Sequence, residues 1–405
     1  MKRVESIDVV RGMVMVIMAL DHIRDLLHLP ALTQDPTSLA TTTAPIFLTR
    51  WITHLCAPTF VFLSGTSAYL SLHKRMTADR DAVTQGWEST RLNSGGEPAA
   101  RNFLLKRGLV LILLEITLIN FAFWTDIQFR SLMIQVIFVI GAGLVILSGA
   151  SRLPVRWLGI AGLVIIFLHD LLPLVPAFKN LAARLGWSLL FRTEVFPFGT
   201  KFMLLVAYPL IPWFGIMLFG YACGPLFALP VDERRKQLLR LSLVSLGVFV
   251  VLRFINLYGD AALWSVQKSG LFTALSFINV SKYPPSLLYT AVTLGIMFAG
   301  LWLTDGANTG FTRIMTVYGK VPLFYYLIHW YLVKAAMIGM VLLQGFSLTD
   351  MPLGPLSFGR PPGAGISLPM VYVVWLGLVL LLYPLCRWYG RYKSEHPQIT
   401  WLRYV

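Results

Sequence analysis

Residues 6–28 read SIDVVRGMVMVIMALDHIRDLLH and have the length of a helix that crosses a membrane. Their ionisable members and two methionines recur at alternating steps of three and four residues, as the stripe Asp8, Arg11, Met15, Met18, His22 and Asp25. Residues at these steps share one face of a helix. An ionisable side chain near the centre of a bilayer costs at least about 2.5–3.5 kcal/mol. The stripe is therefore expected to face other helices or a water-filled cavity rather than lipid.

The composition of the whole chain is that of a membrane protein. Of its 405 residues, 56% are hydrophobic and 13% are charged, whereas soluble domains carry about 25% charged residues. A net charge of +15 would suggest nucleic-acid binding in a soluble protein, but here the basic residues gather in particular loops, so no nucleic-acid partner is expected. The first apolar segment is too long for a signal peptide, contains Arg11 and lacks a small-residue cleavage site. We expect it to remain as a membrane anchor.

Long apolar runs predict an all-α, polytopic bundle of about ten transmembrane helices, because a helix needs about 20 apolar residues to cross. The runs lie at 7–28, 46–72, 103–124, 131–150, 154–175, 203–227, 239–258, 284–304, 316–343 and 368–388. An eleventh helix at 177–200 is the alternative for that stretch. Lys179, Arg184 and Arg192 interrupt it, which favours an interfacial amphipathic segment.

Lysine and arginine in the loops predict the orientation, because loops rich in them face the cytoplasm. They gather at the N-terminus, at 73–106, 152–156, 234–240 and Arg313, and in the C-terminal tail. The opposite loops at 29–45 and 344–367 hold at most one. Both termini are therefore expected in the cytoplasm. We expect a single domain over residues 1–405, with a flexible cytoplasmic loop at 76–102 and a cytoplasmic tail at 389–405.

His22 is the first candidate catalytic residue. A histidine takes and returns a proton near neutral pH, which suits a general base. Asp25 lies one turn later on the same face and is placed to hold the tautomer of His22; Asp21 is the alternative, although it points about 100° away. A purely structural hydrogen bond between helices is the competing interpretation.

His54 and His329 are the other histidines expected at membrane depth. His54 is expected about 12 Å below the outer surface, a depth similar to that of His22, so the two are candidates for one outward-facing pocket. His329 has Tyr325 four residues before it and Tyr326 three before it, so one tyrosine can share its face. For both histidines a structural role is the alternative.

Arg11 is a candidate phosphate-binding residue, because guanidinium binds phosphate through two hydrogen bonds. A pair with Asp8 one turn earlier, or contact with lipid phosphate, is the alternative. Lys282 and Tyr283 open the predicted helix at 284–304 and are placed to meet a polar acceptor; a helix-initiating turn with interfacial anchors is the competing interpretation.

Other polar and sulfur-containing residues suggest no metal centre. The sequence has no pair of histidines four residues apart, so no metal site is expected. Cys56, Cys223 and Cys386 lie in apolar stretches and are expected to be buried and unpaired. Glu115 is a further buried carboxylate without an obvious partner.

Five segments, in this order along the chain, resemble the DUF1624 family of membrane proteins, bacterial relatives of the heparan-alpha-glucosaminide N-acetyltransferase catalytic domain. The segments are SIDVVRGMVMVIMALDHIRD, RWITHLCAPTFVFLSGTSAYLSL, KYPPSLLYTAVTLG, YGKVPLFYYLIHWYLVK and YPLCRWYGRYK. The spacing of Arg11 and His22 also resembles the wider superfamily of transmembrane acyltransferases that modify surface glycans.

The resemblance implies an enzyme of the bacterial inner membrane that moves an acyl group, in the first instance acetyl, from cytoplasmic acyl-CoA to an extracytoplasmic sugar. Arg11, beside Asp8, would hold phosphates of CoA, and His22 would be the general base with Asp25 orienting it. His54 or His329 would stabilise the oxyanion. Lys282, Tyr283 and Tyr325 would contact the acceptor. Membrane lipids and the glycan acceptor are the implied partners, and a homodimer is left open.

The sequence departs from the heparan enzyme at the catalytic positions. As aligned, that enzyme has Asn where His22 stands, an Asp where His54 stands, and its proposed catalytic His in the following luminal loop, whereas residues 29–45 contain no His. The role of His22 therefore follows the wider superfamily. Two other functions compete: a proton-coupled transporter or flippase of an envelope precursor, which paired inverted repeats would favour, and a non-catalytic partner in an envelope assembly.

Overall fold

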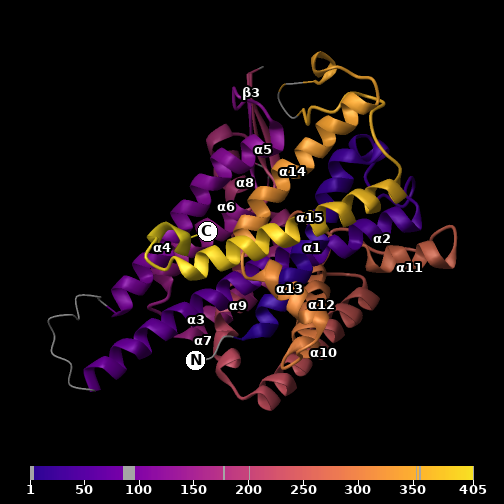
Figure 1. The fold of residues 1–405 in the computed structure, drawn as a ribbon. Helices are drawn as coiled ribbons and strands as arrows, with labels where there is room; N and C mark the ends of the chain where they lie inside the picture. Colours follow the sequence, from indigo (N-terminus) through magenta and orange to yellow (C-terminus); the bar gives the residue numbers. More distant parts are fainter. Residues whose placement is uncertain are drawn as a thin grey trace.

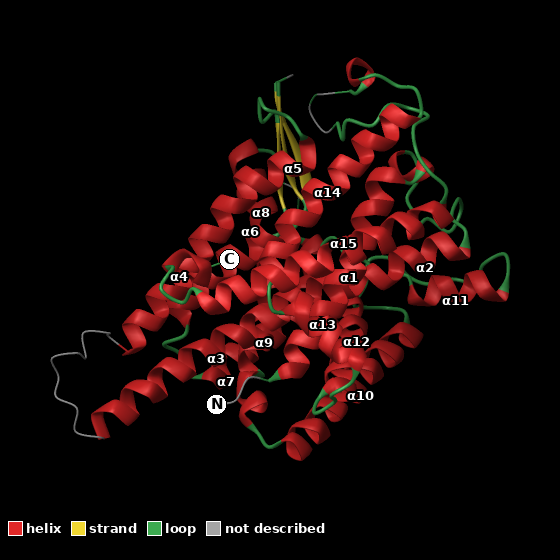
Figure 2. Ribbon diagram, in the orientation of Figure 1, coloured by secondary structure: helices red, strands yellow, loops and turns green. Residues whose placement is uncertain are grey.

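The computed structural model describes residues 4–84, 96–176, 178–199, 201–352, 354 and 357–404. Helices make up most of it, and a small sheet stands at one end of the bundle (Figures 1 and 2). The helices are α1 (Glu5–Leu27), α2 (Ala44–Ile52), α3 (Cys56–Thr84), α4 (Gly96–Leu114), α5 (Asn120–Trp124), α6 (Val136–Ala150), α7 (Val155–Leu168), α8 (Leu181–Phe191), α9 (Leu210–Ala222), α10 (Val231–Ile255), α11 (Gly270–Ile278), α12 (Leu287–Thr304), α13 (Gly310–Gly319), α14 (Pro322–Leu343) and α15 (Leu368–Glu395). The strands are β1 (Ser131–Ile134), β2 (Glu194–Phe198) and β3 (Phe202–Val206). A π-helical turn spans Glu115–Ile119, and 3₁₀ turns span Leu29–Leu32, Thr53–Leu55, His169–Leu174, Gly224–Ala228, Leu348–Asp350 and Thr400–Arg403.

The helices confirm a membrane protein built mainly of α-helices. Among the described residues, seven helical stretches are long and apolar enough to cross: Ala44–Lys74, Val155–Leu174, Leu210–Ala228, Val231–Ile255, Leu287–Thr304, Pro322–Leu343 and Leu368–Glu395. α6 and α8 are shorter apolar helices. α1 is 23 residues long but carries six acidic and basic residues, so its composition alone does not mark it as a span. The number of crossings and the side of the termini remain predictions.

α1 occupies the centre of the bundle (Figure 1). It packs against α3, α12, α13, α14 and α15, and most of its residues are buried. Met15 and Met18, in the middle of the polar stripe, are 1% and 5% exposed. The middle of the stripe therefore faces protein, while Arg11 and Asp25 near its ends line cavities.

Glycines bring the backbones at the centre into contact. A Cβ on Gly12 would lie 1.9 Å from the backbone oxygen of Met315, and one on Gly319 would lie 1.8 Å from that of Asp8. These two glycines let α1 and α13 touch without intervening side chains, as small residues do between membrane helices. α3 and α9 cross in the same way through Gly65 and Gly220.

One small sheet of three strands is the exception to the expected all-α fold. β1 and β3 pair in parallel and β2 joins β3 antiparallel, in the order β1-β3-β2. Residues 131–134 and 203–206 were expected to begin membrane helices, but α6 starts at Val136 and α9 at Leu210. Short apolar runs fit a buried strand as well as part of a helix, so periodicity alone does not separate the two.

Two predicted helices are interrupted. The run 316–343 is divided between α13 and α14, because Gly319 ends the first and Pro322 begins the second. The run 46–72 is divided into α2 and α3 by the 3₁₀ turn at Thr53–Leu55. Both interruptions adjoin the cavities described below.

The flanking segments contain more helix than expected. α3 continues to Thr84 and α4 starts at Gly96, so helix covers both ends of the expected flexible loop 76–102, and residues 85–95 lie outside the described part of the chain. In the tail, α15 continues to Glu395 and a 3₁₀ turn follows. Within 177–200, α8 forms the expected short helix and is followed by β2; its place at the membrane interface remains a prediction.

Candidate functional site

His22 of α1 and His329 of α14 form a hydrogen-bonded pair. His22 Nδ1 lies 2.6 Å from His329 Nε2, and the rings stack with centroids 4.9 Å apart. His329 Nδ1 lies 3.2 Å from the backbone oxygen of Tyr325, and the indole of Trp330 stacks on His22 at 4.0 Å. His329 is fully buried, whereas His22 retains partial exposure.

This network assigns the tautomers of both rings. The carbonyl of Tyr325 only accepts, so His329 Nδ1 carries the hydrogen, and in a neutral ring Nε2 is then the acceptor. His22 Nδ1 must therefore donate to His329. A neutral His22 then presents an unprotonated Nε2, which makes no hydrogen bond with any described residue and is the atom a general base needs.

Asp25 does not share this network. Its carboxylate bonds Arg24 Nη2, and its side chain is 53% exposed. Asp21, the alternative, bonds Arg24 at 2.7 Å and Arg50 at 3.4 Å. The hydrogen-bond partner of His22 is thus His329 rather than an aspartate, and both carboxylates lie in a cluster with arginine side chains.

The sequence left open whether Tyr325 or Tyr326 shares a face with His329, and in the structure both lie beside it. The ring of Tyr325 stacks at 5.6 Å, and that of Tyr326 lies at 5.3 Å. The Tyr325 side chain is completely buried, and its hydroxyl has no hydrogen-bond partner among the described residues. Tyr326 also lies 6.4 Å from the His22 ring, so the histidine pair is enclosed by aromatic side chains.

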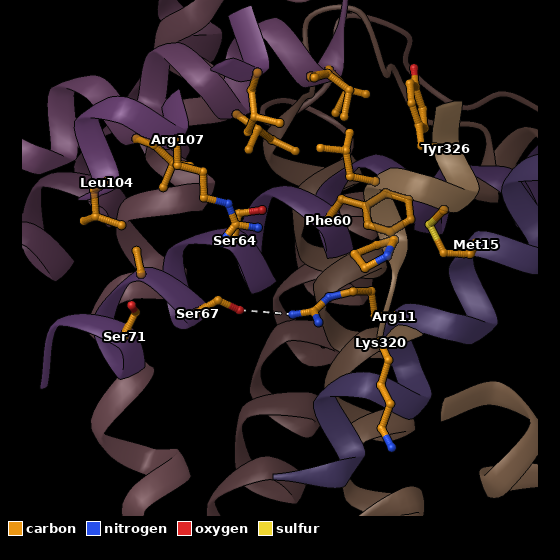
Figure 3. Close-up of a pocket in the computed structure, with 18 of the residues that line it drawn as sticks. Arg11, Met15, Phe60, Ser64, Ser67, Ser71, Leu104, Arg107, Lys320 and Tyr326 are labelled. Atoms are coloured by element: carbon orange, nitrogen blue, oxygen red, sulfur yellow. Dashed lines mark hydrogen bonds between the residues drawn. The ribbon is translucent and has the colours of Figure 1, made fainter. Parts of the chain in front are cut away.

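A basic cavity of about 240 Å³, here called the Arg11 cavity, lies on one side of the pair. Arg11 donates to Ser67 Oγ at 3.0 Å (Figure 3), to Asp8 at 3.2 Å and to the backbone oxygen of Gly319 at 3.3 Å. Its polar and aromatic lining comprises Arg11, Arg107, Lys320, Lys393, Ser64, Ser67, Ser71, Phe60 and Tyr326. No acidic residue occurs among the described residues that line it, so the cavity suits an anion.

A polar cavity of about 690 Å³, here called the His54 cavity, lies near the other end of α1. Its polar lining includes Arg24, Asp25, Gln34, Asp35, Arg50, His54, Asn279, Ser281, Lys282 and Tyr283. The 3₁₀ turn between α2 and α3 places His54 there. His54 is 3% exposed, and its Nδ1 has no hydrogen-bond partner in the part of the chain that the structure describes.

Lys282 and Tyr283 reach this cavity on a segment that is held in place. Asp260 accepts hydrogen bonds from Ser281 N at 2.8 Å, Ser281 Oγ at 2.8 Å and Ser286 Oγ at 2.6 Å. Ser286 also caps α12 by accepting from the backbone N–H of Tyr289, so the helix-initiating turn considered for this segment is present. The Lys282 ammonium lies 5.0 Å from the centre of the Tyr283 ring.

The histidine pair has a neighbour that lines the Arg11 cavity and is linked through Asp21 to the His54 cavity. Tyr326 lines the Arg11 cavity and neighbours His22, while Asp21, next to His22 in sequence, binds Arg24 and Arg50 of the His54 cavity. The cavities share none of the described lining residues. The described linings of the two cavities are therefore separate, and Tyr326 and Trp330 lie beside the histidine pair.

Several residues of the site were not predicted as such from the sequence: Arg24, Arg50, Arg107 and Trp330, while Asp21 and Tyr326 were named only as alternatives. Arg50 and Arg107 each interrupt a predicted span, and this intramembrane charge was the available signal. No group of three metal-binding side chains occurs among the described residues.

A family model described as heparan-alpha-glucosaminide N-acetyltransferase, catalytic, matches residues 3–255. No curated protein matches the chain. The matched region contains His22, His54 and both helices that carry Arg11 and Arg107, whereas His329 and Lys282 lie outside it. Since the match covers more than half of the 405 residues, the chain belongs to the family of the heparan-alpha-glucosaminide N-acetyltransferase catalytic domain, a family of membrane acetyltransferases.

Proposed function

We propose that this protein transfers an acyl group, in the first instance acetyl, from cytoplasmic acyl-CoA to a hydroxyl or amine of a sugar or other glycan on the opposite side of a bacterial inner membrane. The observation that carries the proposal is the His22–His329 pair, whose neighbours are Tyr326 of the basic cavity and Asp21, which binds two arginines of the polar one. Family membership supplies the reaction class.

The Arg11 cavity is the proposed donor site. Arg11, Arg107, Lys320 and Lys393 carry positive charge suited to the phosphates of CoA. Asp8 holds Arg11 through its ion pair rather than meeting the ligand. The thioester would then lie at the end formed by Phe60 and Tyr326, close to the histidine pair.

The His54 cavity is the proposed acceptor site. Arg24, Asn279, Lys282 and Tyr283 offer hydrogen-bond donors and acceptors to a sugar. Tyr325 lies behind His329 and is expected to support the pair rather than contact a sugar. Asp25, on the cavity wall, would help fix Arg24.

His22 Nε2 would accept the proton of the acceptor hydroxyl or amine as the acceptor oxygen or nitrogen attacks the thioester carbon. His329 would hold the required tautomer and disperse the charge of the imidazolium. The unpartnered His54 Nδ1 is the proposed donor to the oxyanion of the tetrahedral intermediate. Collapse of this intermediate breaks the carbon–sulfur bond and releases CoA.

A transporter or flippase is the second candidate. The interrupted helices α13–α14 and α2–α3 adjoin the Arg11 and His54 cavities respectively, and interrupted helices at binding sites are a feature of transporters. The proposals differ in chemistry, because only the acyltransferase consumes the thioester.

The test is incubation of purified protein with radiolabelled acetyl-CoA, followed by measurement of thioester hydrolysis and of transfer to added amino sugars. His22→Ala is expected to lower turnover by about 10²–10⁴-fold. His396→Ala, at the C-terminal end of α15 and outside the linings of both cavities, is expected to match the wild type. Unchanged turnover in His22→Ala would remove His22 as the base. Absence of CoA binding and of thioester cleavage in the wild type would favour transport.

A further inference from the structure

A further cavity, of about 970 Å³ and here called the Arg192 cavity, has no part in the transfer mechanism above. Ser281 and Tyr283 line it, and the same two residues line the His54 cavity. The two cavities therefore adjoin, and a ligand in the proposed acceptor site has a second, larger space beside it.

The Arg192 cavity lies where three candidate membrane spans end. The spans are Val155–Leu174, Val231–Ile255 and Leu287–Thr304. Leu172, Leu257 and Ser286, which lie at or next to these ends, all line the cavity. The polar head groups of lipids lie just outside the hydrocarbon core that such spans cross. The cavity is therefore expected at the level of the head groups.

Hydrogen bonds hold the walls of this cavity together. His169 Nε2 lies 2.6 Å from the backbone oxygen of Pro285, and Asp170 accepts from the backbone N–H of Leu287 at 2.8 Å. These bonds tie the 3₁₀ turn after α7 to the start of α12. The space is thus formed by the fold itself, as binding pockets usually are.

Each acidic side chain among the described lining residues already has a partner. Asp170 has the backbone N–H of Leu287 and lies 3.3 Å from a ring nitrogen of His169. Glu194 forms an ion pair with Arg184. Asp260 accepts from two serine hydroxyls and two backbone N–H groups. The acids of the cavity are therefore occupied within the protein.

Two cations of the lining, Lys179 and Arg192, remain for a ligand. Both are exposed, and neither side chain forms an ion pair with any residue in the described part of the chain. A guanidinium beside an ammonium suits phosphate, and basic side chains at a membrane surface attract anionic lipids. The cavity therefore favours an anion at the level of the head groups.

The same cavity has an apolar wall. Trp187 packs against Phe178 and Phe191, with ring centroids 5.4 and 4.4 Å apart, and all three rings line the cavity. Leu257, also in the lining, is 81% exposed. Apolar surface beside unpaired cations matches a molecule that carries both a phosphate and a hydrocarbon chain.

We propose that the acceptor is a sugar joined to a lipid through phosphate, with the sugar in the His54 cavity and the phosphate on Arg192 and Lys179. This inference rests on the proposed acyl transfer and names the class of its acceptor. Tyr283, which lines both cavities, would lie beside the bond between sugar and phosphate. Trp187 and Leu257 would contact the first methylene groups of the lipid.

The affinities of four probes for the purified protein in a neutral detergent, measured by titration calorimetry, test the inference. The decyl ester of glucosamine 1-phosphate has the sugar, the phosphate and a chain. Decyl glucosaminide lacks the phosphate, glucosamine 1-phosphate lacks the chain, and dihexanoyl phosphatidylglycerol lacks the sugar. The Kd of the decyl ester is expected to be at least about tenfold below that of each other probe, since one hydrogen bond to a charged group contributes about that much.

Three variants assign the phosphate preference to the cavity. Arg192→Gln and Lys179→Gln are each expected to raise the Kd of the decyl ester about tenfold and to leave that of decyl glucosaminide unchanged. Lys201→Gln removes the same charge from an exposed position outside the cavity lining and is expected to bind as the wild type does. A variant that failed to fold would lose both probes, so it is recognised.

Equal binding of the decyl ester and decyl glucosaminide by the wild type would overturn the phosphate site. A phosphate preference that survives in both Arg192→Gln and Lys179→Gln would overturn it as well. Phosphatidylglycerol binding as tightly as the ester would make the cavity a site for ordinary lipids, and glucosamine 1-phosphate doing so would remove the lipid. None of these measurements uses acetyl-CoA. A wild type that binds as expected but does not cleave acetyl-CoA would instead contradict the proposed acyl transfer, so the two failures are distinguishable.

Discussion

At the scale of single residues, the proposed base depends on a partner rather than on its own helix. His22 presents Nε2 because Nδ1 donates to His329, which is in turn fixed by the Tyr325 carbonyl. Loss of the acceptor at position 329 frees the His22 ring to take the other tautomer, and a wrong tautomer can cost about 10⁴ in kcat. His329→Leu is therefore expected to lower kcat for acetyl-CoA turnover by at least about tenfold with little change in KM.

A matched variant separates the hydrogen bond from packing. His329→Gln retains an acceptor oxygen near the position of Nε2 and is expected to keep more activity than His329→Leu. The melting temperatures of both variants are measured in detergent, and their activities are compared only if these temperatures agree. Equal activity in the two, or wild-type activity in His329→Leu, would show that the pair does not set the tautomer of His22.

At the scale of helices, the site depends on the direct contact between α1 and α13. Gly→Ala within a helix is usually favourable by about 0.5–1 kcal/mol, but a methyl on Gly12 would lie 1.9 Å from a backbone oxygen and must separate the helices. Gly12→Ala is expected to lower the melting temperature, consistent with an overpacking cost of about 1–3 kcal/mol. Gly149→Ala, on α6 where nothing lies within 4 Å, is expected to leave it unchanged or raise it. A Gly12→Ala protein as stable as the wild type would contradict this packing.

The helices also show where sequence patterns are sufficient. The stripe on α1 was predictable because helical periodicity and the cost of intramembrane charge lead to the same buried face. The division at Gly319 and Pro322 had its signal in the sequence YGKVP, yet hydropathy alone joined the two helices. β1 and β3 carried no comparable signal, because each depends on a partner strand that is distant in sequence.

At the scale of the whole molecule, the components of the site were predictable but their pairing was not. His22 and His329 are 307 residues apart, and helical spacing along either segment says nothing about that contact. Asp25 was chosen because it is a local neighbour, whereas the competing local pair with Arg24 holds it away. Local rules therefore identified ionisable residues of the interior, and tertiary packing decided which of them meet.

The proposed reaction also requires a fixed orientation of the molecule in the membrane. Lys320 and Lys393 line the Arg11 cavity, and positive loops such as that of Lys236 are expected on the same, cytoplasmic side. One added cysteine is introduced at a time, as Lys236→Cys or Gln34→Cys, and both positions are exposed. The wild type, treated in the same way, gives the background labelling of the three native cysteines. In sealed right-side-out vesicles, a membrane-impermeant maleimide is expected to label Gln34→Cys, and to label Lys236→Cys only after permeabilisation. Acetyl-CoA, which does not cross the bilayer, is then expected to support turnover only from the Lys236 side. Labelling of both positions from one side, or turnover with acetyl-CoA supplied on the Gln34 side, would contradict a donor site at the Arg11 cavity that is reached from the cytoplasm.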